Sequence, residues 1–186
     1  MLNIPEYKEY AGETKIALMD NSSLAFMHEL SQRSYPSDRI LSVYDLILIP
    51  KWVMEEIEDS TYRSTYVEQL QAQGYPIRWI DETKYGAFVN DEDVNLYYIV
   101  EAAGSRVSEL MRFLRRKVKT EDLIDLPSAE EWMNQLYDEW PIYGRTLSTG
   151  RILKKNAGEI SLTILAEIFA WYHDGVNSLT IYTQDT

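Results

Sequence analysis

The stretch Ile16–Leu24 constrains the fold of this chain most, because a short apolar run there ends in an acidic residue and a helix-start signal. Four apolar residues run straight into Asp20, which is typical of a strand buried on both faces of a parallel sheet. The following Asn-Ser-Ser is rich in residue types that begin helices. We therefore expect Asp20 at the carboxyl end of an inner strand, where open α/β sheets bind ligands. The same position also suits a plain helix cap, so both interpretations stay open.

The rest of the chain alternates between strand-like and helix-like segments, which predicts one α/β domain with a parallel sheet flanked by helices. We expect strands at 15–19, 45–49, 76–80 and 178–183, and helices at 22–33, after Pro50, and at 61–73, 94–118, 129–139 and 159–173. Residues 1–14 should form a loosely packed lead-in, 81–93 a polar loop, and 145–155 a basic connector. The expected core comprises about 15–80 and 151–186, with 81–150 as a helical insertion within the single domain 1–186.

The amino-acid composition excludes several kinds of site and disfavours some classes of protein. The 186 residues include no cysteine, which excludes disulfides and thiolate metal ligands, and only two histidines, which disfavours a multi-histidine zinc site. A net charge of −12 argues against a passive nucleic-acid coat. The N-terminus lacks the features of a signal peptide, and no apolar run is long enough for a membrane helix. A cytoplasmic location is therefore expected.

Four carboxylates occupy similar positions in this expected fold: Asp20, Glu56, Glu159 and Asp185. Asp20 and Asp185 follow strands, Glu159 lies in the first turn of the last helix, and Glu56 shares the apolar side of its helix. In a parallel sheet with right-handed crossovers, all four side chains can gather at one edge. Such a cluster is repulsive unless cations neutralise it, and oxygen-only ligands favour Mg²⁺ or Mn²⁺. A site of this kind suits metal-assisted hydrolysis of a phosphodiester.

The order of these motifs resembles that of the PIN-domain nucleases. The resemblance rests on the strand ending at Asp20, on Ile-Pro-Lys-Trp-Val-Met-Glu-Glu-Ile at 49–57, on Gly-Glu-Ile-Ser-Leu at 158–162, and on Thr-Gln-Asp at 183–185. It implies that Asp20, Glu56, Glu159 and Asp185 are metal ligands, with Ser22 and Thr183 as supporting polar residues. The stretch 61–149 is longer than the family core, and the family usually continues beyond its fourth acidic residue.

The resemblance implies an endoribonuclease that depends on Mg²⁺ or Mn²⁺. Its most familiar role would be that of the toxin in a toxin–antitoxin pair, and its second would be RNA processing or decay. Expected partners are RNA, a protein antitoxin or other protein, and a second copy of the chain in a homodimer; no membrane is expected. A PIN-like scaffold that does not cleave is the alternative. Haloacid-dehalogenase-type hydrolases and receiver domains fit less well, because Ser22 stands where the first needs an Asp and the acid pair and lysine of the second are missing.

Two basic stretches are candidate RNA contacts in an otherwise acidic chain. They lie at 112–119, which includes Arg115 and Arg116, and at 145–155, which includes Lys154 and Lys155. The second stretch leads directly into Glu159 and should border the acidic site. Basic residues also suit the carboxyl ends of helices, so Arg115 and Arg116 have a plain structural explanation as well.

Overall fold

The computed structural model describes residues 2–7, 14–89, 93–117, 127–147 and 149–183. Its main sheet has four parallel strands in the order β3-β2-β1-β6, and a separate antiparallel hairpin pairs β4 with β5. The strands are β1 Lys15–Met19, β2 Leu46–Pro50, β3 Ile77–Ile80, β4 Tyr143–Thr146, β5 Ile152–Lys154 and β6 Ser178–Tyr182. The α-helices are α1 Asn21–Gln32, α2 Lys51–Ile57, α3 Thr61–Ala72, α4 Asp93–Ala103, α5 Ser108–Lys117, α6 Ala129–Asp138 and α7 Ala157–Tyr172. Three 3₁₀ segments are η1 Ser37–Val43, η2 Glu82–Phe88 and η3 Gly104–Arg106.

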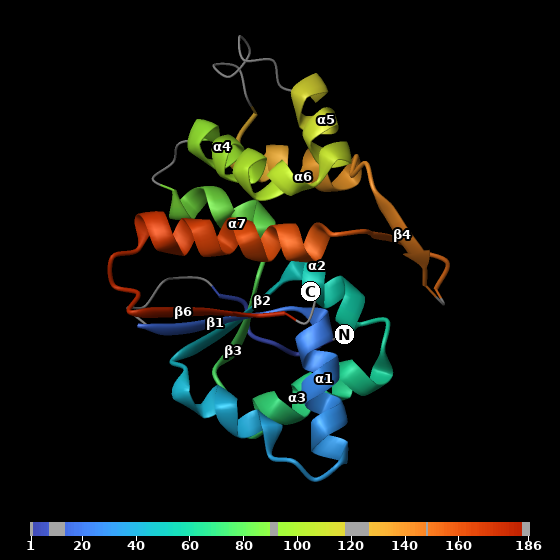
Figure 1. Cartoon of the computed structure of the whole chain (residues 1–186), viewed down its shortest axis with the longest axis vertical. Coiled ribbons are helices and arrows are strands. Elements are labelled where there is room, and N and C mark those ends of the chain that lie inside the picture. Colours follow the sequence, from blue (N-terminus) through green and yellow to red (C-terminus); the bar gives the residue numbers. More distant parts are fainter. Residues whose placement is uncertain (1, 8–13, 90–92, 118–126, 148, 184–186) are drawn as a thin grey trace.

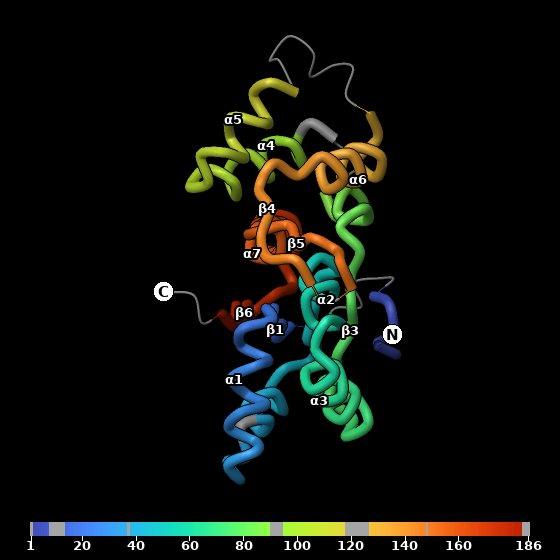
Figure 2. Tube along the Cα trace, turned by 90° about the vertical axis from the view of Figure 1, so that its right-hand side faces the viewer, coloured from blue at the N-terminus to red at the C-terminus, as the bar shows by residue number. Residues whose placement is uncertain are grey.

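The expected α/β class is confirmed: a parallel sheet lies between layers of helices (Figures 1 and 2). Helix α7 covers one face, with α4, α5 and α6 further out on that side, whereas α1 and α3 lie on the opposite face. The inner strand β2 is buried along its whole length, and β1 is buried from Ile16 onward. Each apolar side chain buried in this way contributes roughly 1.5–3 kcal/mol to the free energy of unfolding, so these runs fix the sheet.

The expected single helix over 94–118 is wrong. The chain forms α4, a 3₁₀ turn at Gly104–Arg106, and then a separate helix α5. A Cβ atom built on Gly104 would lie 2.7 Å from Leu110 Cδ2. The glycine therefore lets α5 fold back against the turn, and this close contact outweighs the continuous apolar periodicity of the sequence.

Two segments expected to be irregular are ordered. The lead-in is packed at residues 2–7, where Leu2, Ile4 and Tyr7 are buried. There the backbone N–H of Tyr7 donates to the Trp79 carbonyl at 2.7 Å, so this segment covers the outer edge of β3. Residues 8–13 lie outside the described part. The polar stretch after β3 contains η2, which packs against α6.

The expected basic connector is a β-hairpin. Strand β4 pairs with β5 in an antiparallel register, and a turn with Gly150 at positive φ joins them. The hairpin crosses the expected boundary between insertion and core at 150/151, while that division of the domain remains a prediction. None of the helices within the described ranges combines the length and hydropathy needed to span a bilayer.

The contact between η2 and α6 gives a test of the packing. A Cβ atom on Gly86 would lie 2.3 Å from the Cβ of Ala129, so no methyl group fits there without a backbone shift. We expect Gly86→Ala to lower the free energy of unfolding by about 2 kcal/mol, measured by chemical denaturation. The double variant Gly86→Ala/Ala129→Gly moves the methyl group across the contact and should recover most of that loss. Equal stability of Gly86→Ala and the parent would contradict this packing.

Candidate active site

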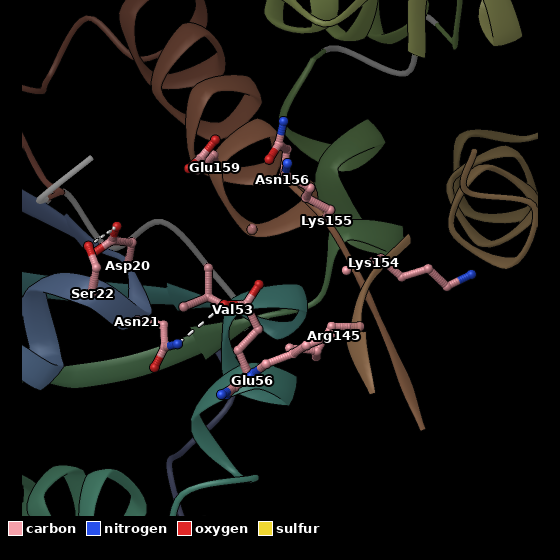
Figure 3. A pocket seen from close by; sticks show the side chains of 13 residues that line it. Asp20, Asn21, Ser22, Val53, Glu56, Arg145, Lys154, Lys155, Asn156 and Glu159 are labelled. Carbon is pink, nitrogen blue, oxygen red and sulfur yellow. Dashed lines mark hydrogen bonds between the residues drawn. The ribbon is translucent and has the colours of Figure 1, made fainter. Parts of the chain in front are cut away.

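Several of the polar residues singled out by the sequence line one pocket at the carboxyl edge of the sheet (Figure 3). Its cavity volume is about 380 Å³, and its walls come from the starts of α1 and α7, from α2, and from the β4–β5 hairpin. The lining includes the carboxylates Asp20, Glu56 and Glu159, the polar Asn21, Ser22 and Asn156, and the basic Arg145, Lys154 and Lys155. Three acidic residues far apart in the sequence therefore share one cavity, as their positions predicted.

Asp20 lies at the carboxyl end of β1 and at the start of α1, where both interpretations of its sequence position place it. It caps α1, because its Oδ1 accepts from the backbone N–H of Ser23 at 2.7 Å, and it also lines the pocket. The Ser23 hydroxyl donates to the same oxygen at 2.7 Å, and the Ser22 hydroxyl donates to Oδ2 at 2.8 Å. These bonds fix the carboxylate plane, and Ser22 lies where a supporting polar residue was expected.

Glu56 projects from the last turn of α2 into the pocket. Asn21 Nδ2 donates to Glu56 Oε2 at 3.3 Å, which ties α2 to the start of α1. Burial is the main cause that raises the pKa of Glu56; the Asn21 hydrogen bond lowers it, and the Asp20 charge raises it further. The charges of Arg63 and Arg145 act in the opposite direction to Asp20. Glu56 thus lies at the boundary between an acidic and a basic wall.

Glu159 reaches the pocket because α7 passes close to α2. The residue before it, Gly158, is buried, and a Cβ atom there would lie 3.0 Å from Val53 Cγ2 and 3.6 Å from Glu56 Oε1. A larger side chain would push the two helices apart. Close packing therefore explains why the 158–162 motif begins with glycine: the missing side chain lets the helices that carry Glu56 and Glu159 approach each other.

The basic wall belongs to the hairpin, which is attached to α2. Arg151 donates from Nη1 to Glu55 Oε2 at 2.9 Å and from Nη2 to the Glu55 carbonyl at 2.7 Å. Arg145 of β4 also lines the pocket, and its side chain lies beside Glu56 in Figure 3. The basic stretch 145–155 was expected to border the site, and Arg145 is one of its residues at the pocket, although it was not named singly. The sequence interpretation missed Asn21 and Asn156 as lining residues.

The predicted basic contacts differ in their surroundings. The Lys154 ammonium donates to the carbonyls of Tyr137 and of Asp138 at the end of α6, and it lies 4.9 Å from the centre of the Tyr137 ring. In Figure 3 its side chain points away from the carboxylates. Lys155 is exposed at the pocket. Arg115 and Arg116 are exposed in the last turn of α5 and do not line the pocket.

The fourth expected ligand, Asp185, lies outside the described residues. Strand β6 ends beside Asp20: the Asp20 N–H donates to the Tyr182 carbonyl at 3.2 Å, and Ser23 Oγ lies 2.9 Å from the same carbonyl oxygen, which is an alternative acceptor for its hydroxyl. Thr183 directly follows β6. The described chain therefore leaves the sheet at the pocket, on the side of Asp20.

The donor set suits Mg²⁺ or Mn²⁺ in one respect and falls short in another. All donors are oxygens, and the buried Asn21 Oδ1 has no hydrogen-bond partner in the described part of the chain. Within the same residues, however, no three acidic or histidine side chains lie close enough to form a metal-binding group. Mg²⁺ often uses one or two carboxylates and completes its shell with water and substrate, so the residues present fit that mode of binding.

A buried carboxyl group that the sequence did not single out holds two walls of the pocket together. Glu82 of η2 is fully buried, and its Oε1 accepts from the Trp52 N–H of α2 at 3.0 Å and from the Ser161 hydroxyl of α7 at 2.7 Å. The Tyr85 hydroxyl lies 2.8 Å from Ser161 Oγ. Burial raises the pKa of Glu82 to about 8, so this carboxyl is protonated at neutral pH.

No protein-family model, curated protein or solved structure matches the chain. The similarity to PIN-domain nucleases therefore rests on the four sequence motifs.

The raised pKa of Glu82 makes a prediction about stability. Between its ordinary value of 4.5 and about 8, the folded state holds a proton that the unfolded state releases, so the free energy of unfolding falls as pH rises through this range. Glu82→Gln stays neutral and keeps an oxygen acceptor, so it should lose that slope and exceed the parent by at least about 1 kcal/mol at pH 8. Denaturation at a series of pH values measures this, with the exposed Glu68→Gln as the control. Parallel curves for parent and Glu82→Gln would contradict the assignment.

Proposed function

We propose that this chain is a PIN-like endoribonuclease that depends on Mg²⁺ or Mn²⁺. The observation that carries the proposal is the shared pocket of Asp20, Glu56 and Glu159, three carboxylates from three separate elements at the carboxyl edge of a parallel sheet. Mutual repulsion between Asp20 and Glu56 contributes to the raised pKa of Glu56, and a bound cation would relieve it.

Each residue has a distinct part in this proposal. Asp20, Glu56 and Glu159 line the pocket without forming one three-carboxylate group, so each cation would be held by one or two of them together with water and substrate. Asp185 is the proposed fourth ligand. A cation bound there lowers the pKa of a water molecule and offsets charge on the phosphate. Ser22 and Ser23 orient the Asp20 carboxylate, and Asn21 orients Glu56. The basic wall, with Lys155 at the pocket, would meet the RNA backbone, which an acidic protein otherwise repels.

The biological role that best suits the resemblance is the toxin of a toxin–antitoxin pair, with a protein antitoxin as partner. RNA processing or decay is the second role. The proposal also includes a homodimer as the assembly and the cytoplasm as the location.

A PIN-like scaffold without activity is the second candidate. One observation favours it: hydrogen bonds from Ser22 and Ser23 already occupy both oxygens of Asp20, so the carboxylate has a complete structural role as a helix cap. In that case the pocket would serve protein binding, and cation-dependent cleavage would be absent.

Cleavage of RNA without free ends separates the two candidates. We expect the protein to linearise a circular RNA in Mg²⁺ or Mn²⁺ but not in EDTA, because only an endonuclease can cut a closed strand. Asp20→Asn, Glu56→Gln and Glu159→Gln should each reduce the rate about a hundredfold or more, since each removes a charge from the proposed cation site. Glu68→Gln on α3 is the matched exposed control. Intact RNA at every metal concentration would support the scaffold instead.

Cation binding should also be visible without catalysis. Millimolar Mn²⁺ is expected to raise the melting temperature by several degrees, because about 100-fold excess over the dissociation constant contributes about 2.7 kcal/mol to the folded state. Asp20→Asn should abolish most of this gain. Asparagine caps helices as well as aspartate does, so the substitution removes the charge while it preserves the cap of α1. If Mn²⁺ does not change the melting temperature of the parent protein, the cation site is contradicted.

A further inference from the structure

A second cavity lies between α1 and α3, which pack against each other on one face of the sheet (Figures 1 and 2). Its volume is about 560 Å³, which falls within the range of about 300–1,000 Å³ that is typical of small-ligand sites. The lining comprises His28 and Gln32 of α1 and Tyr62, Tyr66 and Gln69 of α3, together with two threonines. This cavity is the α1–α3 groove.

The side chains of the α1–α3 groove are aromatic or polar. The rings of His28 and Tyr66 are in contact, with centroids 5.2 Å apart and planes inclined by 53°. Gln32 Nε2 lies 3.3 Å from His28 Nε2, within hydrogen-bonding distance, and restrains the imidazole. Tyr62 is 77% exposed in the first turn of α3, so most of its ring is accessible. The groove therefore offers aromatic rings beside amide groups that both donate and accept hydrogen bonds.

The composition of this lining restricts what can bind. Within the described part of the chain, no aspartate, glutamate, lysine or arginine lines the groove, and no leucine, isoleucine, valine or methionine does. Phosphate groups bind to cationic side chains, which are missing here. A partner helix binds in a hydrophobic groove, which amides and threonines do not form. An unpaired nucleobase fits this lining, because it is uncharged, stacks on tyrosine or histidine and forms hydrogen bonds along its edges.

Helix α1 connects the groove with the pocket of Asp20, Glu56 and Glu159. Asn21 at the start of α1 lines the pocket, and His28, which lines the groove, lies seven residues further along. A spacing of seven residues returns to the same face of a helix, about 10 Å further along its axis. Stacked nucleotides of one strand follow each other at about 3.4 Å, so the groove lies a few nucleotides from a phosphate in the pocket.

We infer that the α1–α3 groove binds an unpaired nucleobase of the strand whose phosphate reaches the pocket, with the Tyr62 ring as the stacking surface. Gln32 and Gln69 supply the hydrogen-bonding groups for the edge of the base. The assignment of this base to the substrate of the pocket rests on the proposed ribonuclease function. The fit of a base to the groove does not, because it follows from the aromatic and amide lining.

Equilibrium binding of a labelled single-stranded RNA in Ca²⁺ at several salt concentrations tests the inference. Y62A should weaken binding about tenfold or more, as expected for the loss of one base–aromatic stack. The slope of log affinity against log salt should stay that of the parent, because no phosphate contact is lost. Y62F keeps the ring and should bind as the parent does. The control is Y98A, because Tyr98 is an exposed tyrosine of α4, beyond the other face of the sheet.

A second measurement locates the base. Removal of one base from the RNA, at each position in turn, should weaken binding by the parent at the position that enters the groove. The same removal should cause no further loss with Y62A, because the contact is already absent there. An RNA with 5-iodouracil at that position should form a photochemical cross-link to the peptide that contains Tyr62, identified by mass spectrometry.

The outcomes separate this inference from the ribonuclease proposal. If the parent shows these effects but cleaves no RNA in Mg²⁺ or Mn²⁺, the base site stands and the ribonuclease proposal fails. If the parent cleaves RNA while Y62A binds RNA with the affinity of the parent, the ribonuclease proposal stands and the inference is wrong. A lower melting temperature of Y62A with unchanged RNA affinity would give Tyr62 a structural role and also overturn the inference. A parent protein that binds no RNA would overturn it as well.

Discussion

Two hydrogen bonds to one buried carboxyl group, that of Glu82, join the segments on which the pocket is built. The acceptor is a single oxygen, and its donors are the Trp52 N–H at the start of α2 and the Ser161 hydroxyl in α7. Glu56 lies one turn after Trp52, and Glu159 lies two residues before Ser161. Because the group is fully buried, the loss of either donor would leave polar atoms unsatisfied in the core. The spacing of the two acidic residues thus depends on a third one that never reaches the pocket.

The pocket is divided electrostatically, and the division follows the elements. The sheet and the helices packed on it contribute carboxylates, whereas the hairpin contributes Arg145 and Lys155. The pKa of Glu56 is raised mainly by burial, and both walls affect it, because the charge of Asp20 raises it and that of Arg145 lowers it. In a protein of charge −12, a local basic wall would reduce the long-range repulsion of the anionic polymer that we propose as substrate.

The sequence predicted the strands and most helices well, because continuous apolar runs and capping residues are local signals. It also placed Asp20, Glu56 and Glu159 at one edge, because parallel topology makes strand ends converge. The sequence-based prediction was wrong where contacts between residues far apart in the chain determine the local structure. The break at Gly104 depends on Leu110 packing against it, and the hairpin at 143–154 depends on attachment to α2 and α6. Glu82 lay in a polar stretch that looked like a loop, and only its burial reveals its role.

The choice between the cation-site proposal and the scaffold proposal depends on why position 20 is an aspartate. Asparagine or serine caps a helix as well as aspartate does, so the cap of α1 does not require a carboxylate. The hydrogen bond between Asn21 and Glu56 likewise needs only an acceptor oxygen. Yet both positions are acidic, and their repulsion combines with burial to raise the pKa of Glu56. This repulsion does not stabilise the fold, whereas a bound cation would attract both carboxylates, and this difference favours the cation-dependent proposal over the scaffold.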